Sequence, residues 1–278
     1  MDQVVAWLLN SIFGTATTDV ESLVNAPGYV DVLRNAAVTI NDVAVKPLAA
    51  VVVAIMVTLS LVRNASRMEG DRVLGVKIIA STMFAAALTV IVVQNASGIL
   101  DGIIQVGDSL IKAVNGLGLP TSSGTSQRIG DEMHDQILKA GFAKQLAMFV
   151  VLLFPWLIVT AAGVMAKVLI VVRWFEIYIK AAFAPLPLTF FGNEDTKPMA
   201  IGYLKSFATS VLSGVTILIA LRLFQAVEGS LLTTLPVDKT ADAFNFIGTN
   251  MVTFLVPPLV LLWVLKSTTS LARAVVGG

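Results

Sequence analysis

The stretch VAVKPLAAVVVAIMVTLSLV, residues 43–62, decides the fold class. One helix needs about 20 mostly apolar residues to cross a bilayer, and this run has that length. Asn41 and Asp42 precede it and are typical of a helix N-cap, with Pro47 in the first turn. A second apolar run follows at residues 76–93. The two runs predict two consecutive membrane-spanning helices.

The short connection between these runs, residues 63–77, is basic. Against two acidic residues it carries four basic ones, Arg63, Arg67, Arg72 and Lys77. Short loops dense in Lys and Arg stay in the cytoplasm. We therefore expect these four residues to set the topology, with this loop inside and the N-terminus outside.

The composition of the 278-residue chain agrees with a membrane protein. Apolar residues make up 56% and charged residues 13%, and the mean hydropathy is +0.84, whereas soluble domains carry roughly 25% charged residues. A net charge of +1 gives no overall attraction to nucleic acid. The absence of cysteine excludes disulfides and cysteine-ligated metal.

Two amphipathic segments flank the first pair of spans. Residues 4–13 predict a short helix at the membrane surface, and no signal peptide is indicated. Residues 99–118 alternate apolar and polar faces at helical spacing. That helix would pack on its neighbours or the bilayer, or would present a polar wall to a lumen or a partner. A Pro- and Gly-containing hinge, residues 119–130, follows it.

The run from Gln145 to Phe191 permits two interpretations. It is either one long helix that crosses the membrane and continues into the cytoplasm, or a tight hairpin turning between Lys167 and Arg173. In the long helix, charged residues at steps of three and four share one face: Arg173, Glu176 and Lys180. This face would be a docking surface or the lining of a channel mouth, or else a solvated stripe at the lipid headgroups.

The last two spans are predicted at residues 206–227 and 250–265, and Pro257 and Pro258 predict a helix break in the final one. The long-helix interpretation gives five spans and places the C-terminus inside. It also leaves more than half of the 19 basic residues on the cytoplasmic side. The hairpin gives six spans and moves several of them outward, so charge counting favours five.

The fold class predicted is therefore all-α: a polytopic membrane protein with about five transmembrane helices and amphipathic surface helices. Its expected segments run in chain order: an extracytoplasmic amphipathic segment, 1–42; two spans with their basic loop, 43–93; an extracytoplasmic segment and hinge, 94–144; and a C-terminal bundle, 145–278, with a cytoplasmic part at about 167–205.

The stretch RWFEIYIKAAFAPLPLTFF, residues 173–191, carries a family resemblance. A basic-flanked helix runs into an Ala-x-x-Pro-Leu-like break at residues 182–186, where Pro185 and Pro187 end the helix, and a short loop and a further span follow. This pattern resembles the polytopic inner-membrane channel subunit of type IV secretion and conjugation systems, the TrbL-type family. The order of spans resembles it too, although the tryptophan expected after the loop is absent.

The resemblance implies a channel or scaffold component in the bacterial cytoplasmic membrane, working as a homo-oligomer. Its implied partners are membrane lipids, secretion ATPases and bitopic assembly proteins, and its cargo is single-stranded DNA with its relaxase or an effector protein. The alternative is a small-solute transporter, although no internal repeat supports it. With one histidine and no nucleophile or phosphate-loop motif, the sequence predicts no enzyme, no metal site and no cofactor.

Overall fold

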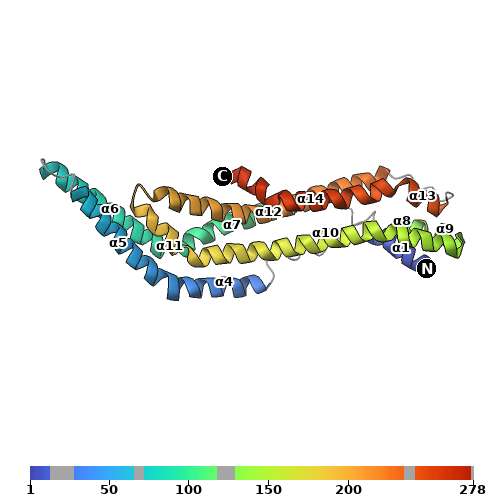
Figure 1. Cartoon of the computed structure of the whole chain (residues 1–278), viewed down its shortest axis with the longest axis horizontal. Coiled ribbons are helices and arrows are strands. Elements are labelled where there is room, and N and C mark those ends of the chain that lie inside the picture. Colours follow the sequence, from blue (N-terminus) through green and yellow to red (C-terminus); the bar gives the residue numbers. More distant parts are fainter. Residues whose placement is uncertain (13–27, 66–71, 118–128, 235–241, 277–278) are drawn as a thin grey trace. The chain divides into compact units, whose positions relative to one another are not determined.

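A computed structural model describes residues 1–12, 28–65, 72–117, 129–234 and 242–276, and every regular element in these ranges is helical. The elements, shown in Figure 1, are α1 (Asp2–Ile12), α4 (Tyr29–Ile40), the π-helix η1 (Asn41–Val45), α5 (Lys46–Ala65), α6 (Arg72–Gln94), α7 (Ala96–Asn115), α8 (Ile129–Glu132), α9 (His134–Lys139), α10 (Phe142–Phe183), α11 (Pro185–Leu188), the 3-10 helix η4 (Thr189–Gly192), α12 (Lys197–Thr234), α13 (Ala243–Thr249) and α14 (Met251–Val276). The predicted all-α class is confirmed.

Five helical stretches are long and apolar enough to cross a membrane: Tyr29–Asn64, Gly75–Gln94, Phe142–Phe183, Lys197–Leu231 and Met251–Val276. The third is α10, which is uninterrupted over 42 residues although Pro155 lies inside it. A hairpin near Lys167 is therefore excluded, and the expected single long helix and five candidate spans are confirmed.

The chain forms two compact units. The first unit consists of Met1–Pro27, Leu110–Val172 and Ser213–Leu271, and the second of Gly28–Ser109, Arg173–Leu212 and Ala272–Gly278. Helices α7, α10, α12 and α14 contribute residues to both units.

In the first unit, α1 packs on α8 and α9. The Asn10 side chain of α1 accepts a hydrogen bond from the Gly130 N–H (2.8 Å) and donates one to Asp131 (3.1 Å), so it caps the start of α8. A Cβ atom on Gly130 would lie 2.2 Å from the carbonyl oxygen of Ala6. Only glycine therefore permits this close approach of α8 to α1.

Also in the first unit, Asp242 caps α13. Its side chain accepts a hydrogen bond from the Phe244 N–H (3.3 Å) and another from Lys144 Nζ of α10 (2.7 Å). Asp242 lies between the fourth and fifth candidate spans. The Lys144 hydrogen bond, followed by the Phe244 amide, holds the pKa of Asp242 below its ordinary value of 3.8.

We expect the cap of α13 to depend on acidity. Because the folded pKa of Asp242 is depressed, its stabilising contribution is complete above pH 3.8 and is lost as the pH falls through the folded pKa. Substituting Lys144→Gln should raise that pKa, and the carboxyl ¹³C shift of Asp242 followed against pH measures it. An unchanged pKa in the variant would contradict the Lys144 assignment, and Lys139→Gln is a control outside this contact.

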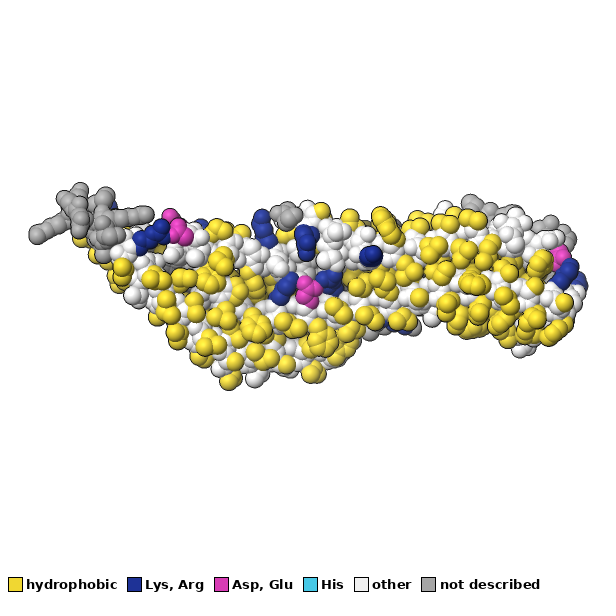
Figure 2. Space-filling view, in the orientation of Figure 1, with side chains coloured by type: hydrophobic (Ala, Val, Ile, Leu, Met, Phe, Trp, Pro, Cys, Tyr) yellow, Lys and Arg dark blue, Asp and Glu magenta, His cyan; other side chains and the backbone are white. Residues whose placement is uncertain are grey.

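In the second unit, α4, η1 and α5 follow one another without a gap, and α5 and α6 lie side by side as a helical hairpin. The short helices α11 and η4 pack on both helices of this hairpin. The hairpin exposes large apolar side chains, among them Val51, Ile55, Leu59, Met83 and Phe84. Hydrophobic side chains also cover most of its visible face in Figure 2. Such an apolar surface is typical of helices that contact lipid tails.

The predicted N-cap at Asn41 and Asp42 is wrong, because the helix begins at Tyr29 and runs through both residues. No glycine or proline between Tyr29 and Lys46 would end it. Pro47 lacks an N–H and crowds the preceding turn, and the chain widens there into the π-helix, in which the Lys46 N–H bonds to the Asn41 carbonyl.

The last span also differs in detail from the expected pattern. α14 continues through Pro257 and Pro258, so the helix neither begins nor ends at the expected break. The interruption lies earlier, at Asn250 between α13 and α14. The predicted hinge at residues 119–130 lies mostly outside the described residues, as does Arg67.

Candidate functional site

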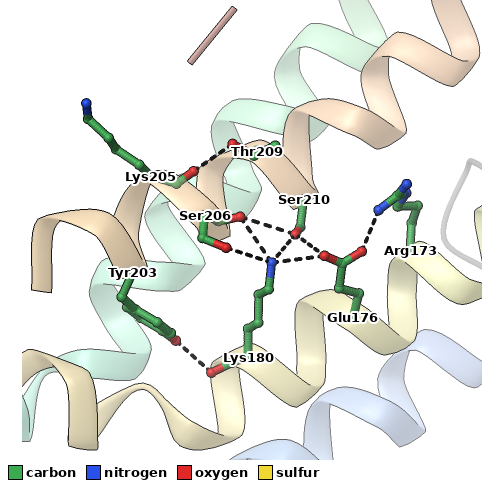
Figure 3. Close-up of polar contacts among 8 residues, drawn as sticks. All are labelled: Arg173, Glu176, Lys180, Tyr203, Lys205, Ser206, Thr209 and Ser210. Atoms are coloured by element: carbon green, nitrogen blue, oxygen red, sulfur yellow. Dashed lines mark hydrogen bonds and ion pairs between the residues drawn. The ribbon is translucent and has the colours of Figure 1, made fainter. Parts of the chain in front are cut away.

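The predicted face of α10 is assembled in the second unit. Glu176 accepts hydrogen bonds from Arg173 Nη1 and, at 2.9 Å, from Lys180 Nζ, as the spacing of three and four residues predicts. The structure therefore brings all three residues together as one ion-pair cluster, shown in Figure 3.

This cluster is directed toward α12. Lys180 Nζ lies 2.6 Å from Ser210 Oγ and 3.0 Å from Ser206 Oγ, and it also reaches the Ser206 carbonyl at 3.2 Å. Ser210 in turn donates a hydrogen bond to Glu176 (2.8 Å), which closes the network between the helices (Figure 3). The two serines lie four residues apart on α12, on one face of that helix.

The cluster is partly shielded from its surroundings. The side chains of Arg173, Lys180 and Glu176 are 12%, 25% and 33% exposed. One carboxylate thus pairs with two cations in a site of reduced polarity, where hydrogen bonds to charged groups are strong and an unpaired charge is costly. The network joins α10 to α12 just before the helix break.

The break itself is capped by side chains from other helices. α10 ends at Phe183, and Pro185 cannot supply the N–H that a continuing helix would donate to the Ala181 carbonyl. Asn41 Nδ2 of η1 donates to that carbonyl instead (3.1 Å), together with the Ala184 N–H (3.2 Å). The orphaned acceptor at the proline is therefore satisfied.

The neighbouring carbonyl is satisfied in the same way. Since the Ala184 N–H bonds to Ala181, it is diverted from the Lys180 carbonyl, its ordinary partner in an α-helix. The hydroxyl of Tyr203 on α12 donates to that carbonyl at 2.6 Å (Figure 3). Asn41 and Tyr203 therefore fix the helix end from two sides. We call Asn41, Tyr203 and the cluster residues Arg173, Glu176, Lys180, Ser206 and Ser210 the break node.

Tyr203→Phe tests the second cap. We expect this variant to lose about 1 kcal/mol of stability, the net value of one hydrogen bond whose acceptor stays partly shielded. Thermal unfolding in detergent measures the loss, and Thr209→Val provides a control because that hydroxyl bonds only within its own exposed helix turn. Equal stability of Tyr203→Phe and the wild type would show that this carbonyl needs no cap.

Asn41 is the residue of the break node whose place there sequence reasoning missed, since it was predicted as an N-cap instead. It is 2% exposed, and it lies beside a cavity of about 20 Å³ lined also by Arg34, Asp101 and Tyr178. Arg34 and Asp101 form an ion pair of 3.0 Å there. A space of this size holds one water, so it is too small for a substrate. The only hint in the sequence was that an amide side chain, that of Asn41, interrupts the apolar residues before Pro47.

The described residues predicted to set the topology, Arg63, Arg72 and Lys77, lie at the ends of α5 and α6. Arg63 is in the last turn of α5 and forms an ion pair with Asp195, in the connection between η4 and α12. Arg72 begins α6, and Lys77 lies in its second turn. The end of α5 and the connection 193–196 therefore lie together in the second unit.

The described residues offer no group of three or more His, Asp or Glu side chains that could hold a metal ion. His134, the single histidine, lies 3.6 Å from Asp2 through its Nε2 atom. The chemistry available at the break node is thus ion pairing and helix capping between partly buried helices.

Comparison with known proteins agrees with this architecture. Residues 25–185 match the family of TrbL/VirB6 plasmid conjugal transfer like proteins. The matched range is more than half of the chain; it begins just before α4 and ends at Pro185, so it includes Asn41 and the ion-pair residues of α10. No protein of curated function matches the chain. By the extent of this match, the chain belongs to the TrbL/VirB6 plasmid conjugal transfer-like family.

Proposed function

We propose that the protein is a membrane-embedded channel or scaffold component of a bacterial conjugation or type IV secretion machine. It helps to form the path by which single-stranded DNA with its relaxase, or an effector protein, crosses the cytoplasmic membrane. The observation that carries this proposal is the family match over residues 25–185 in a chain with five candidate spans. The role is structural rather than catalytic, and it needs no cofactor.

In the proposed orientation the N-terminus is outside and the C-terminus is cytoplasmic. Five spans require the two ends to lie on opposite sides of the membrane. The basic ends of α5 and α6 then face the cytoplasm, which agrees with the preference of short basic loops for that side. The ion pair between Arg63 and Asp195 supports the same side for the loop before α12.

The hydrogen bond between Asn41 and Ala181 means that the expected bounds, 1–42 outside and about 167–205 inside, cannot both hold. The part of the break node proposed to dock the secretion ATPases, or to line the channel mouth, is the ion-pair face of α10, Arg173, Glu176 and Lys180. Its support is mechanical: the end of α10 is held by Asn41 and by three side chains of α12, Tyr203, Ser206 and Ser210. A docking surface on a turn held by several helices keeps its shape when a partner binds, whereas a flexible turn would have to be ordered first.

The test is substrate transfer in a host that carries the machine. Deleting this gene should abolish transfer, and the wild-type gene should restore it. Crosslinking with formaldehyde during transfer, followed by immunoprecipitation of this protein, should recover the transferred DNA strand or effector. Undiminished transfer after deletion, together with the loss of uptake of a small solute, would contradict the proposal and favour a transporter.

A further inference from the structure

A polar cavity of about 410 Å³ lies within the second unit, between the ends of α5 and α6 and the loop before α12. α5 contributes Ser60, Arg63 and Asn64 to its lining. α6 contributes Lys77, Ser81 and Thr82. A cavity of this size accommodates a small ligand or the headgroup of a lipid.

The third wall of the cavity, Gly192–Asp195, is held in place. A Cβ atom on Gly192 would lie 2.9 Å from the hydroxyl of Thr89, so the absence of a side chain lets this loop approach α6 closely. The Asn193 side chain accepts a hydrogen bond from the Asp195 N–H (3.0 Å), and Thr196 donates one to the Phe190 carbonyl (3.0 Å). These contacts fix the conformation of this wall of the cavity.

Several polar groups of the lining are already occupied. Arg63 pairs with Asp195, and the Asn64 side chain donates to Thr82 at 2.7 Å. In contrast, neither Lys77 nor Glu194 takes part in a hydrogen bond or an ion pair with any part of the chain that the structure describes. Among the described residues, the ammonium of Lys77 and the carboxylate of Glu194 are therefore available to bind a ligand, and the hydroxyls of Ser60 and Ser81 also line the cavity.

The rim of this cavity continues onto apolar surface. Leu59 and Val62 of α5 are 57% and 65% exposed, and Val76 and Met83 of α6 are 68% and 63% exposed. In a spanning hairpin these side chains contact lipid tails. A ligand that fills the polar cavity and lies along this rim must therefore have a polar head of both charge signs and apolar chains.

We propose that this cavity binds a zwitterionic phospholipid whose headgroup joins a phosphate to a primary ammonium. Lys77 and the serine hydroxyls bind the phosphate, Glu194 binds the ammonium, and the acyl chains lie along the exposed faces of α5 and α6. A bound lipid of this kind fastens the hairpin to the loop before α12 at the membrane surface.

The test compares lipids by native mass spectrometry of the full-length protein in detergent. The probes are phosphatidylethanolamine, phosphatidylglycerol, which lacks the ammonium, and soluble phosphoethanolamine, which lacks the acyl chains. The wild type should bind phosphatidylethanolamine most tightly of the three. Losing one charge-assisted hydrogen bond weakens binding by about tenfold.

Two variants separate the two charges. Lys77→Gln should weaken both phospholipids about tenfold, whereas Glu194→Gln should weaken phosphatidylethanolamine by about tenfold and leave phosphatidylglycerol unchanged. Lys77→Arg should bind as the wild type does, and Lys266→Gln, on α14 and outside the cavity, serves as the matched control.

Three results would overturn the proposal. One is that Lys77→Gln and Glu194→Gln bind phosphatidylethanolamine as tightly as the wild type does. Another is a wild-type preference for phosphatidylglycerol. The third is phosphoethanolamine binding as tightly as the lipid, which would assign the cavity to a soluble zwitterion. Thermal unfolding without added lipid should be the same for all variants, because neither charged side chain has a partner within the described residues.

Discussion

Glu176→Gln is expected to lower the free energy of unfolding by about 2–3 kcal/mol. The substitution removes the carboxylate that accepts from Arg173, Lys180 and Ser210, and it leaves two cations shielded in one site. Breaking a fully buried pair costs about 3–5 kcal/mol, and the partial exposure of this cluster reduces that cost. Chemical or thermal unfolding of the protein in detergent measures the change.

Two further variants make this prediction specific. Glu132→Gln removes an exposed carboxylate in the first unit and should change stability by no more than about 0.5 kcal/mol. The double variant Glu176→Gln/Lys180→Gln should lose less stability than the sum of the two single variants. It removes the Lys180 charge together with the Glu176 carboxylate that pairs with it. Strict additivity of the single losses would show that Glu176 and Lys180 are not coupled.

Asn41→Ala should cost about 2 kcal/mol, the second largest effect we expect. Asn41 is buried, and its side-chain amide satisfies the Ala181 carbonyl that Pro185 leaves without its helical donor. The Ala181 carbonyl keeps the Ala184 N–H, so the cost comprises the lost Asn41 hydrogen bond and the space that the buried side chain leaves. The carbonyl ¹³C shift of Ala181 should change in the same variant.

Asn95→Ala is the matched control for Asn41. The Asn95 side chain also donates to a backbone carbonyl, that of Ile91 at 2.8 Å, but it is exposed and water can take its place. Its loss should therefore be within about 0.5 kcal/mol. If Asn41→Ala and Asn95→Ala lost equally little, the capping of the helix break from η1 would be refuted.

Much of this fold could be predicted from local sequence. Each span is a continuous apolar run, so its length and hydropathy suffice to place it. The pairing of Arg173, Glu176 and Lys180 follows from their spacing within one helix, which requires no knowledge of the rest of the chain. Charge counting chose one long helix over a hairpin, and α10 has that form.

The remainder depends on contacts between residues far apart in the chain. Asn41 and Ala181 are separated by 140 residues, and Tyr203 bonds to a carbonyl 23 residues earlier, so no local pattern links them. Asn41 also has the residue type of a helix cap, which made the local interpretation wrong once the helix extended back to Tyr29. Pro257 and Pro258 show the opposite case, since α14 tolerates two prolines that usually end a helix.

The central claim is that this family member works as an oligomeric part of a transfer machine in the membrane. The most direct measurement is to crosslink living cells, purify the protein in mild detergent, and determine its oligomer size and its partners. The account predicts a multimer that carries secretion ATPases and bitopic assembly proteins. Recovery as a monomer or dimer without these partners, stabilised by a small solute, would contradict it.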